Sequence, residues 1–318
     1  MWAYVLRKLL YSIPIYLGIL LIVMAALRVS DPVNAYLGKH ASPEQIELKR
    51  EAMGLNEPFV YQYGKFLRQV FTLDFDSTKS WRYETRSVGE ILSESVVPTL
   101  SITLPAFVIT TIVSIGVGLI AAFYRGRVID RALMVLIVLG MSVSVLVFII
   151  FGQYFGANWL KEHWGLDWFA AGGYEPGIGK WAYYCALPVA IDVILAMGYD
   201  TRFYRAVMVE EATRDYITTA VAKGASKRKV MFVHMLKNAM IPIVTRIMIS
   251  FPFLIGGSIL LETYFRIPGM GRALIEAIVN KDFPVIQAFT AVFAAIFVLS
   301  NILTDVLYAL VDPRVRLS

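Results

Sequence analysis

The stretch PTLSITLPAFVITTIVSIGVGLIAAF, residues 98–123, decides the fold class of this chain. It contains no charged side chain and is longer than the roughly 20 apolar residues that a helix needs to cross a bilayer. Five more stretches are rich in Leu, Ile, Val, Phe and Ala: 10–29, 132–157, 182–206, 240–262 and 284–310. The strict alternation typical of membrane β-barrels is missing. The sequence therefore predicts an all-α polytopic membrane protein with six transmembrane helices.

The composition supports a membrane protein. The chain has 318 residues, of which 58% are hydrophobic and only 17% are charged, and this is too apolar for a soluble domain of such length. The first apolar run follows Arg7 and Lys8, so a signal peptide is an alternative for this segment. No small-x-small cleavage pattern follows the run, which favours a retained helix.

The distribution of Lys and Arg predicts the orientation. With a cytoplasmic N-terminus, most basic residues of the short loops fall on the cytoplasmic side, as the positive-inside rule requires. We therefore expect both termini in the cytoplasm. The net charge of +6 then reflects topology and lipid contact, and we expect no nucleic-acid partner.

The spans divide the chain into four regions. Residues 1–30 hold the cytoplasmic start and first helix, and residues 31–97 form an extracytoplasmic segment. Residues 98–310 form the main transmembrane domain with a cytoplasmic loop at 207–240, and residues 311–318 a cytoplasmic tail.

The extracytoplasmic segment is predicted to form a helical cap. Ser42, Pro43 and Gln45 have the pattern of a capping box at a helix start, and this helix should end near Gly54. Apolar residues at helical spacing predict a second helix over residues 58–71.

A polar, basic segment from Tyr199 to Pro242 interrupts the apolar pattern. No Gly or Pro occurs between residues 206 and 223, which predicts a continuous helix there, and Gly224 should end it in a left-handed conformation. Ser226 can cap a second helix. The resulting hairpin could fit a groove on a partner protein, or lie on anionic lipid through the basic run at 227–229.

Ionisable residues inside spans are functional candidates because they are costly to place in a membrane. Asp192 is the only one that we identify well inside a span, and it could pair with a neighbouring helix or line a solute path. Asp305 and Glu262 are expected near span ends, at lower cost. Gly152 and Gly156 form a small-xxx-small pattern that favours helix packing.

Nucleotide binding by this chain is not expected. The stretch 173–181 looks like a phosphate loop, but Tyr174 stands at its first Gly position and Trp181 at its Ser/Thr position. The three histidines have no Cys or carboxylate partners at metal spacing. The sequence thus predicts no catalytic residue, no metal or cofactor site and no enzyme activity in the chain itself.

Several motifs together resemble one transporter family. Residues 215–224, 234–239 and Pro242 look like the cytoplasmic EAA loop of ABC-importer permeases, most closely those of the dipeptide/oligopeptide/nickel class. Further matches are 41–45, 54–55, 62–63, 98–101, 256–258, 262–271 and 307–316, so the resemblance covers nearly the whole chain.

This resemblance implies a MetI-like, type I ABC-importer permease core preceded by an N-terminal helix and the outer cap. It also implies a location in the bacterial cytoplasmic (inner) membrane. The implied function is half of a translocation path for peptides or a related small solute; permeases of this family also serve nickel and oligosaccharides. The implied partners are a second homologous permease, two cytoplasmic ATPase subunits that use ATP, and an extracytoplasmic solute-binding protein.

The resemblance also implies an ATPase-coupling interface in the loop. Its expected residues are Asp215, Tyr216, Thr218, Thr219, Ala220, Lys223, Gly224 and Ala225. The chain departs from the family at Thr218 and Val221, where Arg is frequent, and near 142–144, where a proline is usual.

Two other classes stay open on the residues alone. An ATP-independent secondary transporter would show inverted repeats or several buried charges along a path. A membrane scaffold or receptor could use the hairpin for signalling. Co-purification of ATPase subunits would favour the importer, and solute flux by the lone chain would favour the secondary transporter.

Overall fold

A computed structural model describes residues 2–29, 31–37 and 41–311 of the chain. Within these residues the secondary structure is helical, apart from one isolated bridge between Lys79 and Ser87. The prediction of an all-α fold is confirmed. The C-terminal tail, residues 312–318, lies outside the described residues, as does the end of the motif at 307–316.

Five helical segments in the described part of the chain are long and apolar enough to cross a membrane, and a bent pair makes a sixth. Four are α1 (Trp2–Leu27), α5 (Val88–Phe123), α9 (Ile178–Glu211) and α16 (Phe283–Val311). The fifth spans Lys227–Ser250 and consists of α11 (Lys227–Lys229), a π-helical segment (Val230–Met235) and α12 (Leu236–Ser250).

The bent sixth segment replaces the straight helix expected over 132–157. It consists of α6 (Val128–Ser142), α7 (Val145–Phe151), a π-helical segment (Gly152–Trp159) and α8 (Leu160–Trp164). The axis turns by 91° between Ser142 and Val145. Val143 is extended there, and the Ser142 hydroxyl donates to the carbonyl of Val138 at 2.8 Å. A break therefore forms without the proline that is usual in the family.

The predicted span at 240–262 is wrong in its second half. Its helix ends at Ser250, and the chain continues as α13 (Phe253–Gly256) and α14 (Ile259–Tyr264). Pro252 has no N–H to continue the helical ladder, and Gly257, with φ of +71°, reverses the chain before α14.

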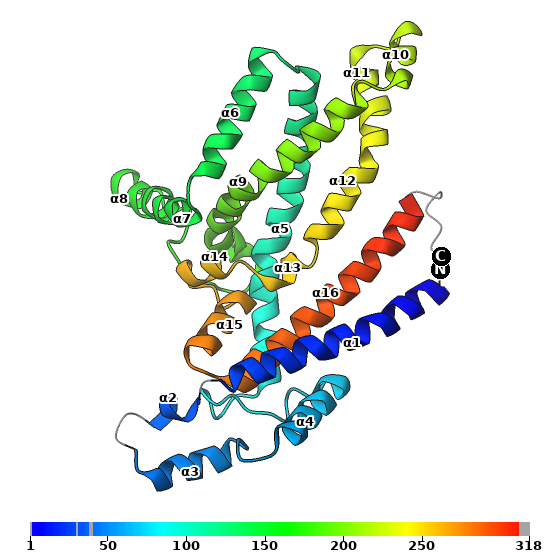
Figure 1. The fold of residues 1–318 in the computed structure, drawn as a ribbon. Coiled ribbons are helices and arrows are strands. Elements are labelled where there is room, and N and C mark those ends of the chain that lie inside the picture. Colours follow the sequence, from blue (N-terminus) through cyan, green and yellow to red (C-terminus); the bar gives the residue numbers. More distant parts are fainter. Residues whose placement is uncertain (1, 30, 38–40, 312–318) are drawn as a thin grey trace.

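Helices α5 and α9 pack along each other in the centre of the molecule, with α6 and α12 beside them (Figure 1). Gly118 allows this approach, because a Cβ there would lie 3.1 Å from the backbone nitrogen of Arg205. Gly152 and Gly156 contact Leu187 and Ile191 of α9, as the small-xxx-small pattern predicts.

Helices α1 and α16 form a second, antiparallel pair (Figure 1). The Tyr16 hydroxyl donates to the carbonyl of Ala291 at 3.1 Å in the middle of the pair. At the end where α1 begins, Tyr4 and Lys8 both bond the carboxylate of Asp305. This contact accounts for the acidic residue near the end of the span.

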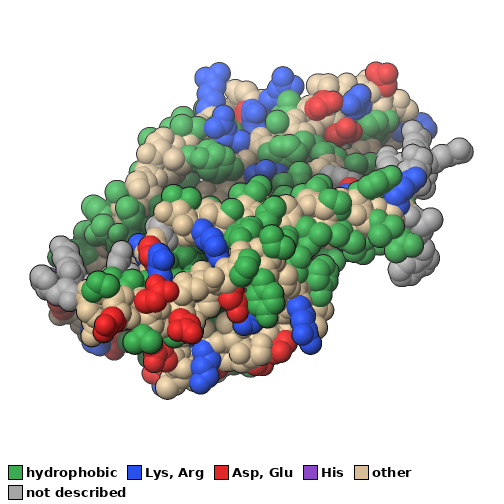
Figure 2. All heavy atoms as spheres, turned by 60° about the horizontal axis from the view of Figure 1, so that its bottom comes forward, with side chains coloured by type: hydrophobic (Ala, Val, Ile, Leu, Met, Phe, Trp, Pro, Cys, Tyr) green, Lys and Arg blue, Asp and Glu red, His purple; other side chains and the backbone are tan. Residues whose placement is uncertain are grey.

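The cap consists of α2 (Val33–Leu37), α3 (Pro43–Ala52) and α4 (Phe59–Thr72) at one end of the bundle. The capping box of Ser42 and Gln45 is present, and Gly54 ends α3 with a positive φ, as predicted. Figure 2 brings this end forward and shows acidic side chains gathered over the cap and hydrophobic side chains over the helices beside it.

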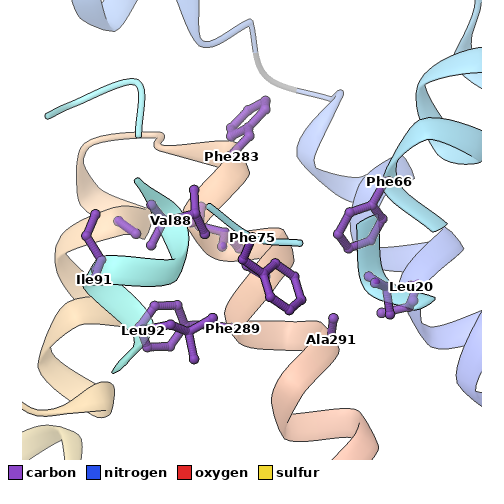
Figure 3. Close-up of a cluster of buried hydrophobic side chains, with 14 of the residues drawn as sticks. Leu20, Phe66, Phe75, Val88, Ile91, Leu92, Phe283, Phe289 and Ala291 are labelled. Atoms are coloured by element: carbon purple, nitrogen blue, oxygen red, sulfur yellow. The ribbon is translucent and has the colours of Figure 1, made fainter. Parts of the chain in front are cut away.

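A hydrophobic cluster joins the cap to the bundle (Figure 3). We call it the cap cluster; its buried members include Leu20 and Met24 of α1, Phe66 and Val70 of α4, Val88, Ile91 and Leu92 of α5, and Phe283, Ile286 and Phe289 of α16. Because these helices all contribute, the cap, α5 and the α1–α16 pair share one core.

Polar contacts hold the loop that leads from the cap to α5. The Asp282 carboxylate, only 2% exposed, accepts from the Ser80 hydroxyl and from the backbone N–H groups of Trp81 and Arg82 at 3.0 and 3.2 Å. This carboxylate therefore fixes the loop against the start of α16.

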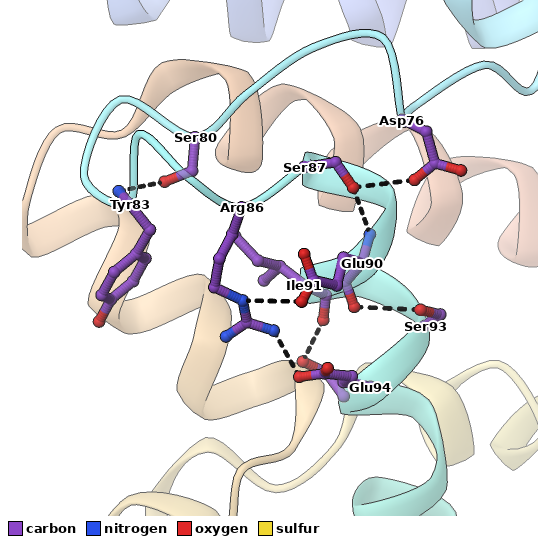
Figure 4. Close-up of polar contacts among 10 residues, drawn as sticks. Asp76, Ser80, Tyr83, Arg86, Ser87, Glu90, Ile91, Ser93 and Glu94 are labelled. Atoms are coloured by element: carbon purple, nitrogen blue, oxygen red, sulfur yellow. Dashed lines mark hydrogen bonds and ion pairs between the residues drawn. The ribbon is translucent and has the colours of Figure 1, made fainter.

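The start of α5 is fixed by a small side-chain network (Figure 4). Ser87 caps the helix by accepting from the N–H of Glu90 at 3.0 Å, and its hydroxyl donates to Asp76 at 2.9 Å. Arg86 binds the carboxylates of Glu90 and Glu94 on the first two turns.

Phe66→Ala should loosen the cap, because truncating a buried Phe costs about 3–5 kcal/mol. We expect faster amide hydrogen exchange in α4, measured by mass spectrometry. Phe71, 64% exposed on the same helix against 6% for Phe66, is the matched control. Equal exchange in the Phe66→Ala and Phe71→Ala variants would show that the cap cluster does not hold α4.

Candidate functional site

The polar segment forms a hairpin at the end of the bundle opposite the cap (Figure 1). Helix α9 ends at Glu211, and a separate short helix, α10 (Asp215–Ala222), follows. The continuous helix predicted over 206–223 is therefore wrong. Thr213 bonds through its hydroxyl to the carbonyl of Glu210 at 2.7 Å, and Arg214 adopts an extended conformation before α10.

Tertiary packing accounts for this break. Ile217 of α10 turns into a cluster of buried side chains from α5, α9 and α12. We call this the hairpin cluster, and its members are Leu119, Ala122, Tyr204, Met208, Ile217, Met235, Ala239 and Ile243. A straight extension of α9 would carry Ile217 away from the bundle, so burial outweighs local helix propensity here.

The end of α10 follows the prediction. Gly224 has φ of +80°, and its N–H donates to the carbonyl of Val221 at 2.9 Å, while the N–H of Ala225 donates to Ala220 at 3.1 Å. This pair of bonds is a Schellman motif. Ser226 then caps α11 by accepting from the N–H of Lys229 at 3.3 Å, also as predicted.

The structure divides the eight predicted interface residues by exposure. Exposed are Asp215, Thr218, Thr219, Lys223 and Gly224; half-buried are Tyr216 and Ala225; buried is Ala220. Ala220 thus packs inward and positions the helix without presenting its side chain to a partner. The Tyr216 hydroxyl bonds Glu211, and burial together with this hydrogen bond raises the pKa of Tyr216.

A polar cavity lies at the middle of the bundle between α5, α9 and α12. Its volume is about 400 Å³, and Asp192, Thr110, Asp200 and Arg246 line it. The Arg246 guanidinium donates to Asp200 at 3.0 Å. Asp192 is not alone among the ionisable residues of the predicted spans. Asp200 and Arg246 stand inside the predicted spans 182–206 and 240–262, and a charge count over these spans would have found them.

Glu262, which was expected near a span end, is completely buried. Its carboxylate accepts from the Thr99 hydroxyl at 2.8 Å and from the N–H of Arg272 at 2.9 Å. The same Thr99 oxygen accepts from the N–H of Met270 at 2.7 Å. Glu262 therefore joins α5, α14 and α15 (Met270–Val279) in one hydrogen-bonded network.

Three glycines leave the space that the Glu262 carboxylate occupies. A Cβ at Gly257, Gly269 or Gly271 would lie 2.3, 2.4 or 3.0 Å from the nearest carboxylate atom. These glycines and Glu262 belong to the stretches 256–258 and 262–271 that carry the family resemblance. Their spacing around a single acidic residue is the sequence signal for this buried site.

A second buried carboxylate holds α6 to α9. Asp130, 3% exposed, accepts from both Nε and a terminal nitrogen of Arg205 at 2.7 Å each, and from the N–H of Gly126 at 2.9 Å. This two-pronged pair fixes the α5–α6 turn beside the hairpin cluster. No local pattern in the sequence indicates this pairing, because the two residues lie 75 positions apart.

Known families match almost the whole chain. The profile described as "binding-protein-dependent transport system inner membrane component" matches residues 114–317, and the profile of the N-terminal part of such membrane components matches residues 1–111. The chain belongs to this family of binding-protein-dependent inner-membrane transport components. The resemblance found from the sequence motifs is thus confirmed.

Individual relatives match over their full length. A probable peptide ABC transporter permease of Sinorhizobium fredii is 34% identical over 321 residues, covering 99% of this chain and all of the relative. A putative peptide transport system permease of Brucella abortus is 35% identical, covering 99% of both chains. A glutathione transport system permease of Salmonella typhi is 33% identical, covering 98% of both.

Family membership establishes the general role. The chain is a membrane-spanning permease subunit of an ABC importer, and such a system includes a binding protein and ATPase subunits as partners. The predicted class of function is confirmed.

Gly269→Ala should destabilise the permease, because the new Cβ would overlap both Glu262 and Thr99. We expect a loss of about 1–3 kcal/mol and a lower Tm in detergent, as for other overpacked sites. Gly256→Ala is the matched control, since nothing lies within 4 Å of a Cβ there. An unchanged Tm in the Gly269→Ala variant would contradict the role of the glycines as a carboxylate cradle.

Proposed function

We propose that the exposed face of α10 and the turn at Gly224 are the surface on which the ATPase subunits act. The observation that carries this proposal is the division of α10 into two faces. Ile217 and Ala220 are buried against the bundle, while Asp215, Thr218 and Lys223 face outward. A force on the outer face would reach the bundle through the buried one.

The hairpin cluster supplies the path for that force. Ile217 packs with side chains from α5, α9 and α12, and these are the three helices that line the polar cavity. A displacement of α10 would therefore shift the cavity walls together, because packed interfaces move as bodies and do not deform continuously. ATP-driven closure of the ATPases would in this way switch the path between its two orientations.

The rest of the assembly follows the same logic. The chain forms half of the translocation path, with a second homologous permease as the other half and two ATPase subunits at the α10 end. That end, with both termini, faces the cytoplasm, and the cap faces the solute-binding protein outside the bacterial inner membrane. The chain itself binds no ATP and no cofactor.

Peptides are the proposed solutes. The similar proteins of Sinorhizobium and Brucella are named for peptide transport, and those of Salmonella for transport of glutathione, which is itself a peptide. Asp192, which faces the cavity at mid-bundle, is proposed to line the solute path.

Gly224→Val should uncouple ATP hydrolysis from the binding protein. A β-branched residue at φ of +80° is strained by about 1–2 kcal/mol or more, so the turn after α10 should change shape. In proteoliposomes with all subunits, we expect the stimulation of ATPase activity by loaded binding protein to fall at least about fivefold, the loss of a typical coupling energy.

Two controls distinguish the effect of changing position 224 from the effect of backbone strain in general. Asn tolerates the left-handed region, so Gly224→Asn should keep most of the stimulation. Gly165, with φ of +66° at the end of α8, has equally open surroundings, and Gly165→Val introduces the same strain away from α10. Normal coupling in Gly224→Val, or equal loss in Gly165→Val, would refute the assignment of α10. Solute flux through the lone chain would favour a secondary transporter instead.

A further inference from the structure

The mid-bundle cavity has a composition that its role as a passage does not require. Helix α5 contributes Thr110, α9 contributes Asp192 and Asp200, and α12 contributes Arg246. Its volume of about 400 Å³ is in the range of sites that enclose small organic ligands. A passage that only needed to be wet could use hydroxyl and backbone groups alone.

The charges of the cavity do not cancel. Asp200 and Arg246 form an ion pair at 3.0 Å, and the Arg246 guanidinium also lies 6.0 Å from the ring centre of Phe203. Asp192 has no hydrogen bond or ion pair with any residue that the structure describes. The lining therefore carries one unbalanced negative charge. An unpaired carboxylate among apolar helices is costly, and a cationic partner would offset that cost.

A second, independent group that lines the cavity, on α5, also lacks a partner among the described residues. Thr110 is only 4% exposed, and its hydroxyl oxygen has no hydrogen-bond partner among the described residues. Buried hydroxyls are nearly always bonded, so an orphaned one on a cavity wall indicates a group that a ligand or water completes. By contrast, the hydroxyl of Thr103, two turns earlier on α5, donates a hydrogen bond to the carbonyl of Leu254 at 2.7 Å.

We infer that Asp192 and Thr110 form a transient site for a primary ammonium group of the solute, such as the amino terminus of a short peptide. This inference rests on the proposed function, because it places the solute in this cavity. An ammonium group carries three N–H donors and can bond a carboxylate and a hydroxyl together. A divalent metal would instead require several free oxygen ligands, whereas the only other carboxylate here is held by Arg246.

The sign of the charge that the cavity presents can be tested without knowing the solute. In a Cys185→Ala background, Ala196→Cys places the only thiol of the chain on the cavity wall, four residues from Asp192 on the same helix. The probes are trimethylammonioethyl and sulfonatoethyl methanethiosulfonate, applied to membranes that contain the complete transporter. We expect Asp192→Asn to lower the ratio of cationic to anionic labelling rates at least about fivefold, the effect of removing a nearby charge.

A matched control separates a local charge from a general one. Glu210→Gln removes an exposed carboxylate from the far end of the same helix and should leave the labelling ratio unchanged. A ratio that does not respond to Asp192→Asn would overturn the cation site. That result would also be obtained if Asp192 were paired with a basic side chain of the second permease.

The ammonium specificity is tested by protection of the same thiol. Trialanine should slow labelling of the Ala196→Cys variant. N-acetyl-trialanine, which lacks the positive charge of the amino terminus, should not. Asp192→Glu should keep the protection and Asp192→Asn should remove it. Equal protection by both peptides would overturn the ammonium site. If Asp192 controls the labelling ratio but the transporter takes up no peptide at all, the proposed peptide function fails and the cation site stands.

Discussion

The buried Glu262 carboxylate is the interaction on which the arrangement of the permease core depends. A charged or protonated carboxyl group removed from water must find hydrogen-bond donors, and Glu262 finds them on α5 and at the start of α15. The glycines at 257, 269 and 271 leave the room for it. Because the fifth membrane segment stops at Ser250, this network takes over from the helical ladder in fixing the short elements α14 and α15 against α5.

Together with this network, the hydrophobic clusters at the two ends of the bundle determine which helices can move as one body. At one end, the cap cluster and the Asp282 contacts join α1, α4, α5 and α16 into a single body. At the other end, the hairpin cluster joins α10 to α5, α9 and α12. Helix α5 takes part in both clusters and in the Glu262 network. A push on α10 thus acts on the one helix that runs through every core of the chain.

The sequence predicted the helical class, the six membrane segments, the capping of α3 and the turn at Gly224, because each depends on local signals: apolar length, a capping box and a glycine after a helix. The breaks at Val143, Thr213 and Phe251 were missed. The break at Thr213 depends on the packing of Ile217 against distant helices, and local propensity carries little of that information. Pro252, by contrast, is a local signal for the break at Phe251 that the predicted span ignored. The same dependence on distant contacts limits what the sequence can predict about the candidate site. Exposure of Thr218 could be guessed from its polarity, but burial of Ala220 and of Glu262 depends on partners that lie far away in the sequence.

Ionisable groups inside the bundle fall into two kinds: those with a charged or hydrogen-bonding partner in the described part of the chain, and one without. We expect the two kinds to have different roles. Asp130 with Arg205, and Asp200 with Arg246, are paired, and Glu262 is fully hydrogen-bonded. Such groups hold helices together, and their replacement should alter stability. Asp192 has no such partner among the described residues and faces open volume. The folded chain alone does not offset the free-energy cost of placing Asp192 inside the bundle, and this uncompensated cost is the reason why we propose that the solute supplies its cationic partner.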